Sequence, residues 1–375
     1  MSLFGLLTNL LLAGSGLGEA AFDETLGEEA RRSVEIASPR DAITLARYAH
    51  DGEARVLAVT SWRDGVVEGV DLGAGGDAVS VMGARGYEGL LAALEGTAAR
   101  ASVPAASLSL PVDFDDRHIA VGTNYPEHAS DAGTTRPFLF PKLVQPGADG
   151  DDVSTNGGLL DYEVEVAVVT LAPYAGGAAP PLLGLMVAND FTDREVLMHV
   201  VDRSDIESGK GFTTGKSFPG YLPVGSLLVV PRDWRGFVGG LALELYVNGR
   251  LRQRARASEM VWSVERILAE SASAKARRWE HRGHEVPLFA GDAIPPRTLV
   301  LTGTPHGTVF AGVPAGVMAA GVLRWLAGGW DRSVPDQVVE AYAEAARERR
   351  AYLQPGDEVL ARIPGLGGLR SRVVD

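Results

Sequence analysis

The chain has 375 residues, with 35 Lys and Arg against 48 Asp and Glu, which gives a formal net charge of −13 at pH 7. A chain this acidic is a poor general binder of nucleic-acid phosphate backbones, because that binding requires a cationic surface. It contains no cysteine, which excludes disulfide scaffolds, cysteine-ligated metal centres and thiol nucleophiles.

We expect residues 1–40 to form an amphipathic helix followed by an acidic linker. Leucines recur there at helical spacing, at positions 3, 6, 7, 10 and 11. A secretory signal begins with positive charge, whereas the first basic residue is Arg31. The helix has no basic face, which favours docking on the protein or a partner subunit over a membrane-surface anchor. No apolar run reaches the roughly 18 residues of a membrane span, and we expect a cytoplasmic protein.

Residues 41–112 are expected to form a small N-terminal β domain. Short β-type runs at 43–48, 56–59 and 66–67 are separated by turn residues. Residues 87–95 have a helical pattern. None of these segments carries a chemical motif, so we expect a structural or dimerisation module.

Residues 113–375 form the largest unit, a β-rich α+β domain without regular βαβ alternation. Strand-like runs lie at 119–122, 163–170, 182–188, 227–230, 243–247, 299–302 and 359–363. No strand is followed by a Gly-x-Gly-x-x-Gly or P-loop motif, so nucleotide binding has no support.

Residues 311–350 interrupt this β pattern. Their first half, 313–330, is rich in Gly, Ala and apolar residues, and Ser333 precedes a helix with Pro335 near its first turn. Two interpretations stay open: a peripheral packing element, or a lid over a pocket.

Three carboxylates lie on or just after two of the predicted strands. Glu163 and Glu165 share one face of a strand, and that face continues with the apolar residues Ala167 and Val169. Carboxylates on a buried face pair with cations or hold a metal. The alternatives are a solvated sheet face and, for Asp190, a turn or helix cap. With Asp190 as a third oxygen donor, the set suits magnesium or manganese better than zinc.

His128 and Asp131 follow the strand at 119–122 and are three residues apart. One helical turn would bring their side chains together. A histidine oriented by a carboxylate is the arrangement of a general base. A surface histidine near an acidic residue is the simpler alternative.

Three cations and one loop are further candidates for binding a substrate. Lys142, Arg194 and Lys216 could neutralise an anionic substrate, or each could be an ordinary surface charge. The loop at 302–307 follows a strand and could present hydroxyls and amides to a ligand, or be a plain turn.

Together these motifs resemble the fumarylacetoacetate hydrolase family. Within it, they resemble the bacterial acylpyruvate hydrolase and 2-oxo acid decarboxylase/isomerase branch more than the tyrosine-degradation enzyme. The matching stretches run in family order: 121–128 (VGTNYPEH), 161–165 (DYEVE), 187–190 (VAND) with Arg194, 215–218 (GKSF), 301–305 (LTGTP) and 353–357 (LQPGD). The resemblance implies a mixed β-roll catalytic domain of fumarylacetoacetase type, a homodimer, and Mg²⁺ or Mn²⁺ in the site.

The resemblance also implies roles for single residues. Glu163, Glu165 and Asp190 would be the metal ligands. His128 would be the general base, with Asp131 as its carboxylate partner. Candidate substrate-binding residues are Tyr125, Lys142, Arg194, Lys216, Thr304 and His306.

Three departures leave the substrate open. Leu197 and Val201 stand in the stretch where the tyrosine-degradation enzyme has polar substrate contacts, which argues against fumarylacetoacetate as the substrate. His306 stands where smaller or other residues are usual, and 311–350 is a longer insertion than most relatives carry. We expect a divalent-metal-dependent hydrolase that cleaves a C–C bond in a small anionic β-diketo or acylpyruvate-type 2-oxo acid through a metal-stabilised enolate. The alternatives are a decarboxylase or isomerase of a 2-oxo dicarboxylate, a secondary-metabolism tailoring enzyme for a larger polyketone, and a non-catalytic binding or assembly protein.

Overall fold

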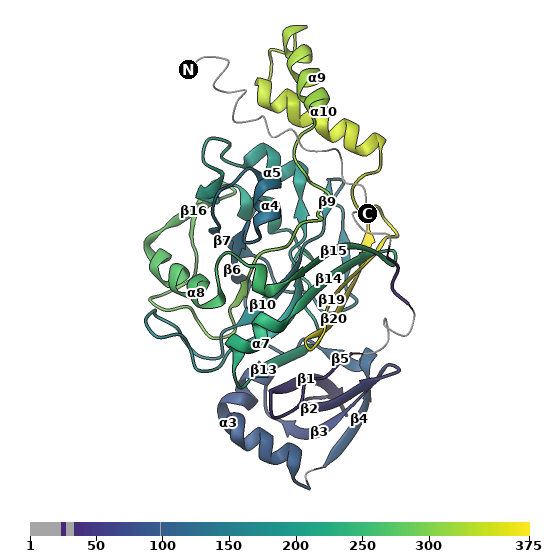
Figure 1. Cartoon of the computed structure of the whole chain (residues 1–375), viewed down its shortest axis with the longest axis vertical. Helices are drawn as coiled ribbons and strands as arrows, with labels where there is room; N and C mark the ends of the chain where they lie inside the picture. The colour runs from purple at the N-terminus through teal and green to yellow at the C-terminus, as the bar shows by residue number, and fades with distance from the viewer. Residues whose placement is uncertain (1–23, 28–33, 98) are drawn as a thin grey trace.

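The computed structural model describes residues 24–27, 34–97 and 99–375. The predicted leucine helix within residues 1–40 lies outside the described residues. The described chain forms a large sheet, a smaller sheet packed against it, and helices around both (Figure 1). This strand-rich architecture confirms the predicted α+β fold class.

Eleven strands of the described chain form the large sheet, in the order β4-β3-β2-β1-β13-β11-β10-β18-β6-β7, with β5 paired to β1. Their bounds are β1 Ala42–His50, β2 Glu53–Arg63, β3 Val66–Ala74, β4 Arg100–Pro104, β5 Leu108–Ser109, β6 Arg117–Gly122, β7 Phe138–Leu143, β10 Val164–Val169, β11 Gly184–Asn189, β13 Leu227–Pro231 and β18 Leu299–Leu301. Strands β10 and β11 are buried along their whole length. Their almost continuous apolar sequence is typical of a strand covered on both faces.

The smaller sheet has the order β15-β14-β19-β20-β8. Its strands are β8 Asp152–Ser154, β14 Ala242–Val247, β15 Arg250–Arg256, β19 Glu358–Ile363 and β20 Gly367–Val374. Strands β15 and β20 alternate buried and more exposed residues, as expected for a sheet with one wet face. Strands β14 and β19 pack against β10 and β11, so part of the hydrophobic core lies between the two sheets.

Helices connect the strands and cover the sheets. They are α3 Ala78–Glu95, α4 Pro126–Ala132, α5 Arg194–Val200, α6 Phe212–Lys216, α7 Trp234–Gly240, α8 Val264–Ser273, α9 Ala315–Leu326 and α10 Val334–Glu348. Two small ribbons pair β9 Leu160–Asp161 with β12 Thr192–Asp193, and β16 Arg278–His281 with β17 His284–Pro287. Within the described ranges, no helix has the length and apolar character needed to cross a membrane.

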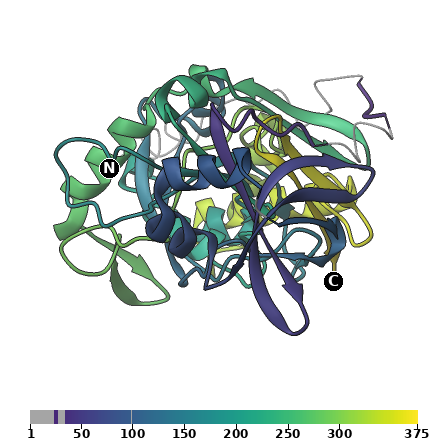
Figure 2. The same ribbon diagram turned by 90° about the horizontal axis from the view of Figure 1, so that it is seen from below.

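Residues 41–112 contain β1–β5 and α3, which lies against β1–β3 (Figure 1 and Figure 2). Strand β1 pairs with β13, with Ile43 opposite Val230, so backbone hydrogen bonds continue the sheet into the rest of the chain. Helix α3 begins at Ala78, earlier than the predicted 87–95, because Asp77 caps it and Gly86 takes up a kink at φ 64°. The division of the chain at residue 112 stays a prediction.

Helices α9 and α10 form a hairpin that projects from the rest of the molecule (Figure 1). Helix α10 begins after Ser333, whose hydroxyl accepts a hydrogen bond from the N–H of Asp336 at 3.3 Å. The two helices approach closely at Gly321, where an added Cβ would lie 2.6 Å from the Cα of Val338. Only glycine fits at this crossing.

The buried side chain of Asp77 links α3 to the loop before β18 through partly buried hydrogen bonds. Its carboxylate accepts from the N–H of Ser80 at 2.9 Å and from Nε and Nη2 of Arg297 at 2.7 and 2.8 Å. It also accepts from the N–H of Asp113 at 3.1 Å. Burial raises the pKa of Asp77, but Arg297 and the other donors outweigh it and hold the pKa well below its usual range.

We expect Asp77→Ala to lower the free energy of unfolding by about 2–4 kcal/mol, because several donors lose their acceptor and Arg297 loses its counter-charge. The depressed native pKa makes this stabilisation complete above the unfolded value of about 3.9, and it is lost as the pH falls further. Urea unfolding should therefore show a difference from the parent chain at pH 7 that shrinks progressively below about pH 4. The exposed Asp116→Ala is the control, and equal stability of both variants at pH 7 would contradict the assignment.

Candidate active site

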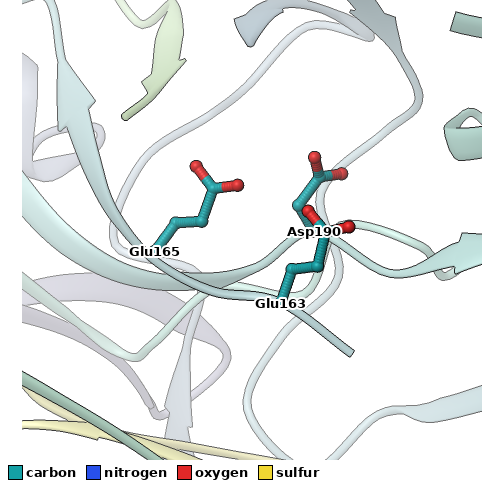
Figure 3. A group of neighbouring side chains, drawn as sticks. All are labelled: Glu163, Glu165 and Asp190. Atoms are coloured by element: carbon teal, nitrogen blue, oxygen red, sulfur yellow. The ribbon is translucent and has the colours of Figure 1, made fainter. Parts of the chain in front are cut away.

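Three carboxylates converge where β10 and β11 lie side by side. Glu163 and Glu165 flank Val164 at the start of β10. Asp190 directly follows β11, and its N–H donates to the backbone carbonyl of Glu163 at 2.9 Å. One oxygen of each carboxylate lies within 4.8 Å of the other two, and all three side chains are buried (Figure 3). The structure thus brings together the three residues that the sequence analysis selected as metal ligands.

Glu163 accepts hydrogen bonds on both carboxylate oxygens. Its Oε1 accepts from Nη2 of Arg194 at 2.7 Å and from the hydroxyl of Thr192 at 3.1 Å. Its Oε2 accepts from Nζ of Lys216 at 2.7 Å. Burial raises the pKa of Glu163, but Lys216 and Arg194 more than offset it and lower the pKa to about 2. Glu163 is therefore ionised at neutral pH.

Asp190 pairs with two buried lysines. Lys142 donates to its Oδ1, and Lys216 donates to its Oδ2 at 2.9 Å. Lys142 is fully buried and also donates to the carbonyl of Tyr221 at 2.9 Å. Burial lowers the pKa of Lys142, despite Asp190. For Lys216 the effect of burial is exceeded by Asp190 and Glu163, which raise its pKa.

Glu165 has a different environment from the other two carboxylates. Its Oε2 accepts a hydrogen bond from the backbone N–H of Gly303 at 2.6 Å. Burial, followed by the charges of Asp190 and Glu163, raises its pKa well above the usual range. Lys216 and the Gly303 N–H act in the opposite direction but are weaker. A further positive charge close to Glu165 would favour its ionised form.

Two buried polar side chains that the sequence analysis did not select hold this arrangement in place. Asp161 accepts from Nε of Arg194 at 2.8 Å and from the N–H of Val309 at 2.9 Å. Gln253 accepts from a backbone N–H of β10 at 3.0 Å and donates to the hydroxyl of Thr304 at 2.9 Å. These partners lie between 33 and 148 residues away along the chain. No local spacing pattern could have identified them.

A pocket of about 130 Å³ opens beside the carboxylates. Its charged and polar lining residues are Thr123, His128, Glu163, Asp190, Arg194, Lys216 and Thr304. The rest of the lining is largely apolar and comes from β6, β7, α5, α6 and the segments that follow α5 and β18. Charged groups and a histidine therefore share a small space with hydrocarbon walls.

The remaining candidate residues differ in whether they line this pocket. His128, on α4, is 7% exposed and lines the pocket. Tyr125 is buried at the start of α4, and His306 is half-buried; neither lines the pocket. The side chain of Asp131 lies outside the described residues, so its pairing with His128 stays a prediction.

Most of the chain matches a family of known proteins. A family model described as fumarylacetoacetate (FAA) hydrolase, C-terminal, matches residues 117–374. A Burkholderia multivorans protein described as a hydrolase is 29% identical over 202 residues, which cover 51% of this chain and 62% of that protein. The mitochondrial oxaloacetate tautomerase Fahd2a of Rattus norvegicus is 28% identical over 275 residues, which cover 70% of this chain and 68% of that protein. The chain thus spans less than two thirds of the Burkholderia protein.

Solved structures share the fold. The 2-hydroxyhepta-2,4-diene-1,7-dioate isomerase of Mycobacterium marinum superposes with a TM-score of 0.55 and 20% identity, covering 88% of this chain and 98% of its own. A fumarylacetoacetate hydrolase of Exiguobacterium antarcticum gives a TM-score of 0.54 and 21% identity, covering 88% and 99%. At these identities the likeness establishes the fold alone.

Gly303 determines the position of the loop that binds Glu165. Its φ is +91°, and an added Cβ would lie 2.7 Å from Cβ of Asn124. We expect Gly303→Ala to lower the free energy of unfolding by about 2–4 kcal/mol, from the strained φ together with the steric clash. Gly291→Ala is the matched control, because Gly291 has φ +79° but open space around it. It should lose only about 1–2 kcal/mol. Equal losses in urea unfolding would exclude the contact with Asn124 as a cause.

Proposed function

The chain belongs to the fumarylacetoacetate hydrolase family, and on this basis we propose that it is a divalent-metal-dependent hydrolase of a β-diketo or acylpyruvate-type 2-oxo acid. The proposal rests on the buried carboxylate cluster of Glu163, Glu165 and Asp190 beside a pocket that His128 also lines. This arrangement supports a metal site and a general base that act on one small pocket.

We assign the metal to Glu163, Glu165 and Asp190. Three carboxylates are hard oxygen donors, which suit Mg²⁺ or Mn²⁺. The raised pKa of Glu165 fits this assignment, since a bound cation would favour its ionised form. Each carboxylate oxygen also has more than one lone pair, so the hydrogen bonds to Lys142, Lys216 and Arg194 leave capacity for a metal. A divalent ion held there would supply a Lewis acid for the negative charge that develops on the substrate's oxygens.

The side chains of the protein would bind the substrate and move the proton. Arg194 and Lys216 line the pocket and would attract the carboxylate end of a 2-oxo acid. His128 would take a proton from water on its imidazole, and the resulting hydroxide would add to the distal carbonyl carbon. The bond between that carbon and the neighbouring methylene then breaks, and its electron pair is delocalised onto the 2-oxo group. Return of the proton to the methylene carbon gives pyruvate, and the distal part leaves as a carboxylic acid.

A 2-oxo acid tautomerase is the second candidate, because the rat relative is an oxaloacetate tautomerase. That reaction moves one proton between carbon and oxygen of the substrate. It would use the same carboxylate cluster and His128 but no water. A homodimer and a cytoplasmic location stay predictions.

Metal-stripped protein is expected to cleave acetylpyruvate only after Mg²⁺ or Mn²⁺ is added. His128→Ala should lower kcat by about 10²–10⁴-fold with metal binding retained. Glu163→Gln should lose metal binding in calorimetry, because one ligand charge is removed. The exposed Glu127→Gln, next to His128, is the control and should retain both properties.

Cleavage that needs no metal, or unchanged metal affinity in Glu163→Gln, would contradict the proposal. Metal-dependent tautomerisation of oxaloacetate without any cleavage of acetylpyruvate would favour the second candidate.

We also propose that the hairpin α9–α10 braces the pocket wall. The ring of Tyr342, on α10, meets the ring of Phe310 edge-on at 6.0 Å, and its hydroxyl lies 2.7 Å from that of Tyr352. Arg347 of α10 forms an ion pair with Glu195 of α5. Phe310 and α5 both line the pocket, so α10 supports two parts of its wall from outside.

Replacing Tyr342 should test this bracing. We expect Tyr342→Leu to raise KM several-fold with a smaller change in kcat, because Phe310 loses its aromatic neighbour. Tyr342→Phe is the matched control, since it keeps the ring and removes only the hydroxyl. A KM in Tyr342→Leu equal to that of Tyr342→Phe would argue against a role of this ring in the pocket.

A further inference from the structure

We propose, building on the function proposed above, that this site selects 2-oxo acids with one carboxylate and an apolar acyl group and discriminates against dicarboxylates. Two features of the pocket support this proposal: the order of the side chains along one wall, and the charges around its floor, which is the side formed by the carboxylate cluster, Arg194 and Lys216.

Helix α5 and the residue after it present one face to the pocket. Arg194, Leu197, Met198 and Val201 all line it, and their spacing places them on one side of a helix. Arg194 donates to Glu163 at 2.7 Å, so the charged end of this face lies at the carboxylate cluster. At a rise of about 1.5 Å per residue, Val201 lies roughly 10 Å further along. Along this face of α5, the side chain at the cluster is charged and the side chains further from it are apolar.

The remaining wall beyond the cluster is apolar as well. Ile206, Phe212 and Phe310 line it. The ring of Phe212 lies 5.4 Å from that of Phe140, a buried side chain that also lines the pocket. Cζ of Arg194 lies 5.7 Å from the centroid of the Phe310 ring, so apolar lining begins directly beside the charged floor. A substrate tail that extends past the cluster therefore meets aliphatic and aromatic groups.

The arginine and lysine that line the pocket are already engaged with carboxylates. Arg194 is paired with Asp161 and Glu163 at 2.8 and 2.7 Å. Lys216 is paired with Glu163 and Asp190 at 2.7 and 2.9 Å. Both cations lie at the floor, beside the cluster. Away from these two cations, the described lining has two polar side chains besides Thr304, Thr123 and His128, and no lysine or arginine that could pair with a second carboxylate.

The charge around the floor also matches a monoanion. The ionic side chains around the floor are the cluster itself, the cations Lys142, Arg194 and Lys216 that pair with it, and Asp161, which pairs with Arg194. These four carboxylates and three cations carry one net negative charge when ionised, which a divalent ion would convert to one net positive charge. His128 has to be uncharged to accept a proton as the proposed base. One substrate carboxylate balances the site, and a second would be buried without a counter-charge.

Binding of unreactive 2-oxo acids tests this selectivity without catalysis. We would titrate the metal-loaded protein with 2-oxobutanoate, 2-oxohexanoate and 2-oxoglutarate in a calorimeter. Affinity should rise about fourfold for each methylene buried in the apolar wall, so 2-oxohexanoate should bind roughly tenfold or more tighter than 2-oxobutanoate. It should also bind more tightly than 2-oxoglutarate. Equal or tighter binding of 2-oxoglutarate would overturn the proposal.

A matched pair of variants tests whether the apolar lining of α5 causes the preference against dicarboxylates. Met198→Arg places a cation in the apolar lining and should shift the preference toward 2-oxoglutarate by about tenfold. Val200→Arg adds the same charge two residues away, at a position that is 43% exposed and does not line the pocket. It should leave the order of affinities unchanged. An equal shift in both variants would show that general charge, and not the lining, sets the preference.

The two proposals fail in different ways. If monoanionic apolar 2-oxo acids bind best but no diketo acid is cleaved, the proposed reaction is wrong and the selectivity stands. If fumarylpyruvate is hydrolysed faster than hexanoylpyruvate at limiting concentration, the selectivity is wrong and the reaction stands.

Discussion

Carboxylates can be buried together only when positive charge lies within hydrogen-bonding distance, and this requirement organises the structure around Glu163 and Asp190. The compensating charges come from three separate elements. Lys142 belongs to β7, Arg194 begins α5 and Lys216 ends α6. Their ion pairs therefore fix how these elements sit around β10 and β11. Well-packed apolar residues often stabilise a core as well as a buried ionic network does, so a network of this size is better explained by chemistry than by stability.

The three carboxylates of the cluster do not receive equal amounts of compensating positive charge. Glu163 and Asp190 each accept hydrogen bonds from two cationic side chains, whereas Glu165 accepts one from the backbone N–H of Gly303. Burial beside two carboxylates raises the pKa of Glu165, which makes this the point of the cluster most in need of a positive charge. A divalent ion shared by the three carboxylates would meet that need.

Local patterns predicted what depends on local geometry. Period-two spacing placed Glu163 and Glu165 on one face, and the Ser333 cap marked the start of α10. Contacts between distant segments could not be read in the same way. The pairing of β1 with β13, and the roles of Asp161 and Gln253, depend on partners far along the chain. The early start of α3 was missed because its glycines disfavour a helix, and tertiary packing with an Asp cap overrides that preference.

Residues 194–201 contribute to both the proposed chemistry and the proposed selection of the substrate. Their helical spacing places one face of the segment both at the carboxylate cluster and along the pocket. Its first residue, Arg194, is fixed by Glu163 and Asp161, so the orientation of α5 is determined at the carboxylate cluster. Once that end is fixed, Leu197 and Val201 must face the pocket as well. Their apolar side chains would therefore contact any part of a substrate that extends beyond the charged floor. Because α10 contacts α5, the α9–α10 hairpin and the apolar wall form one structural unit.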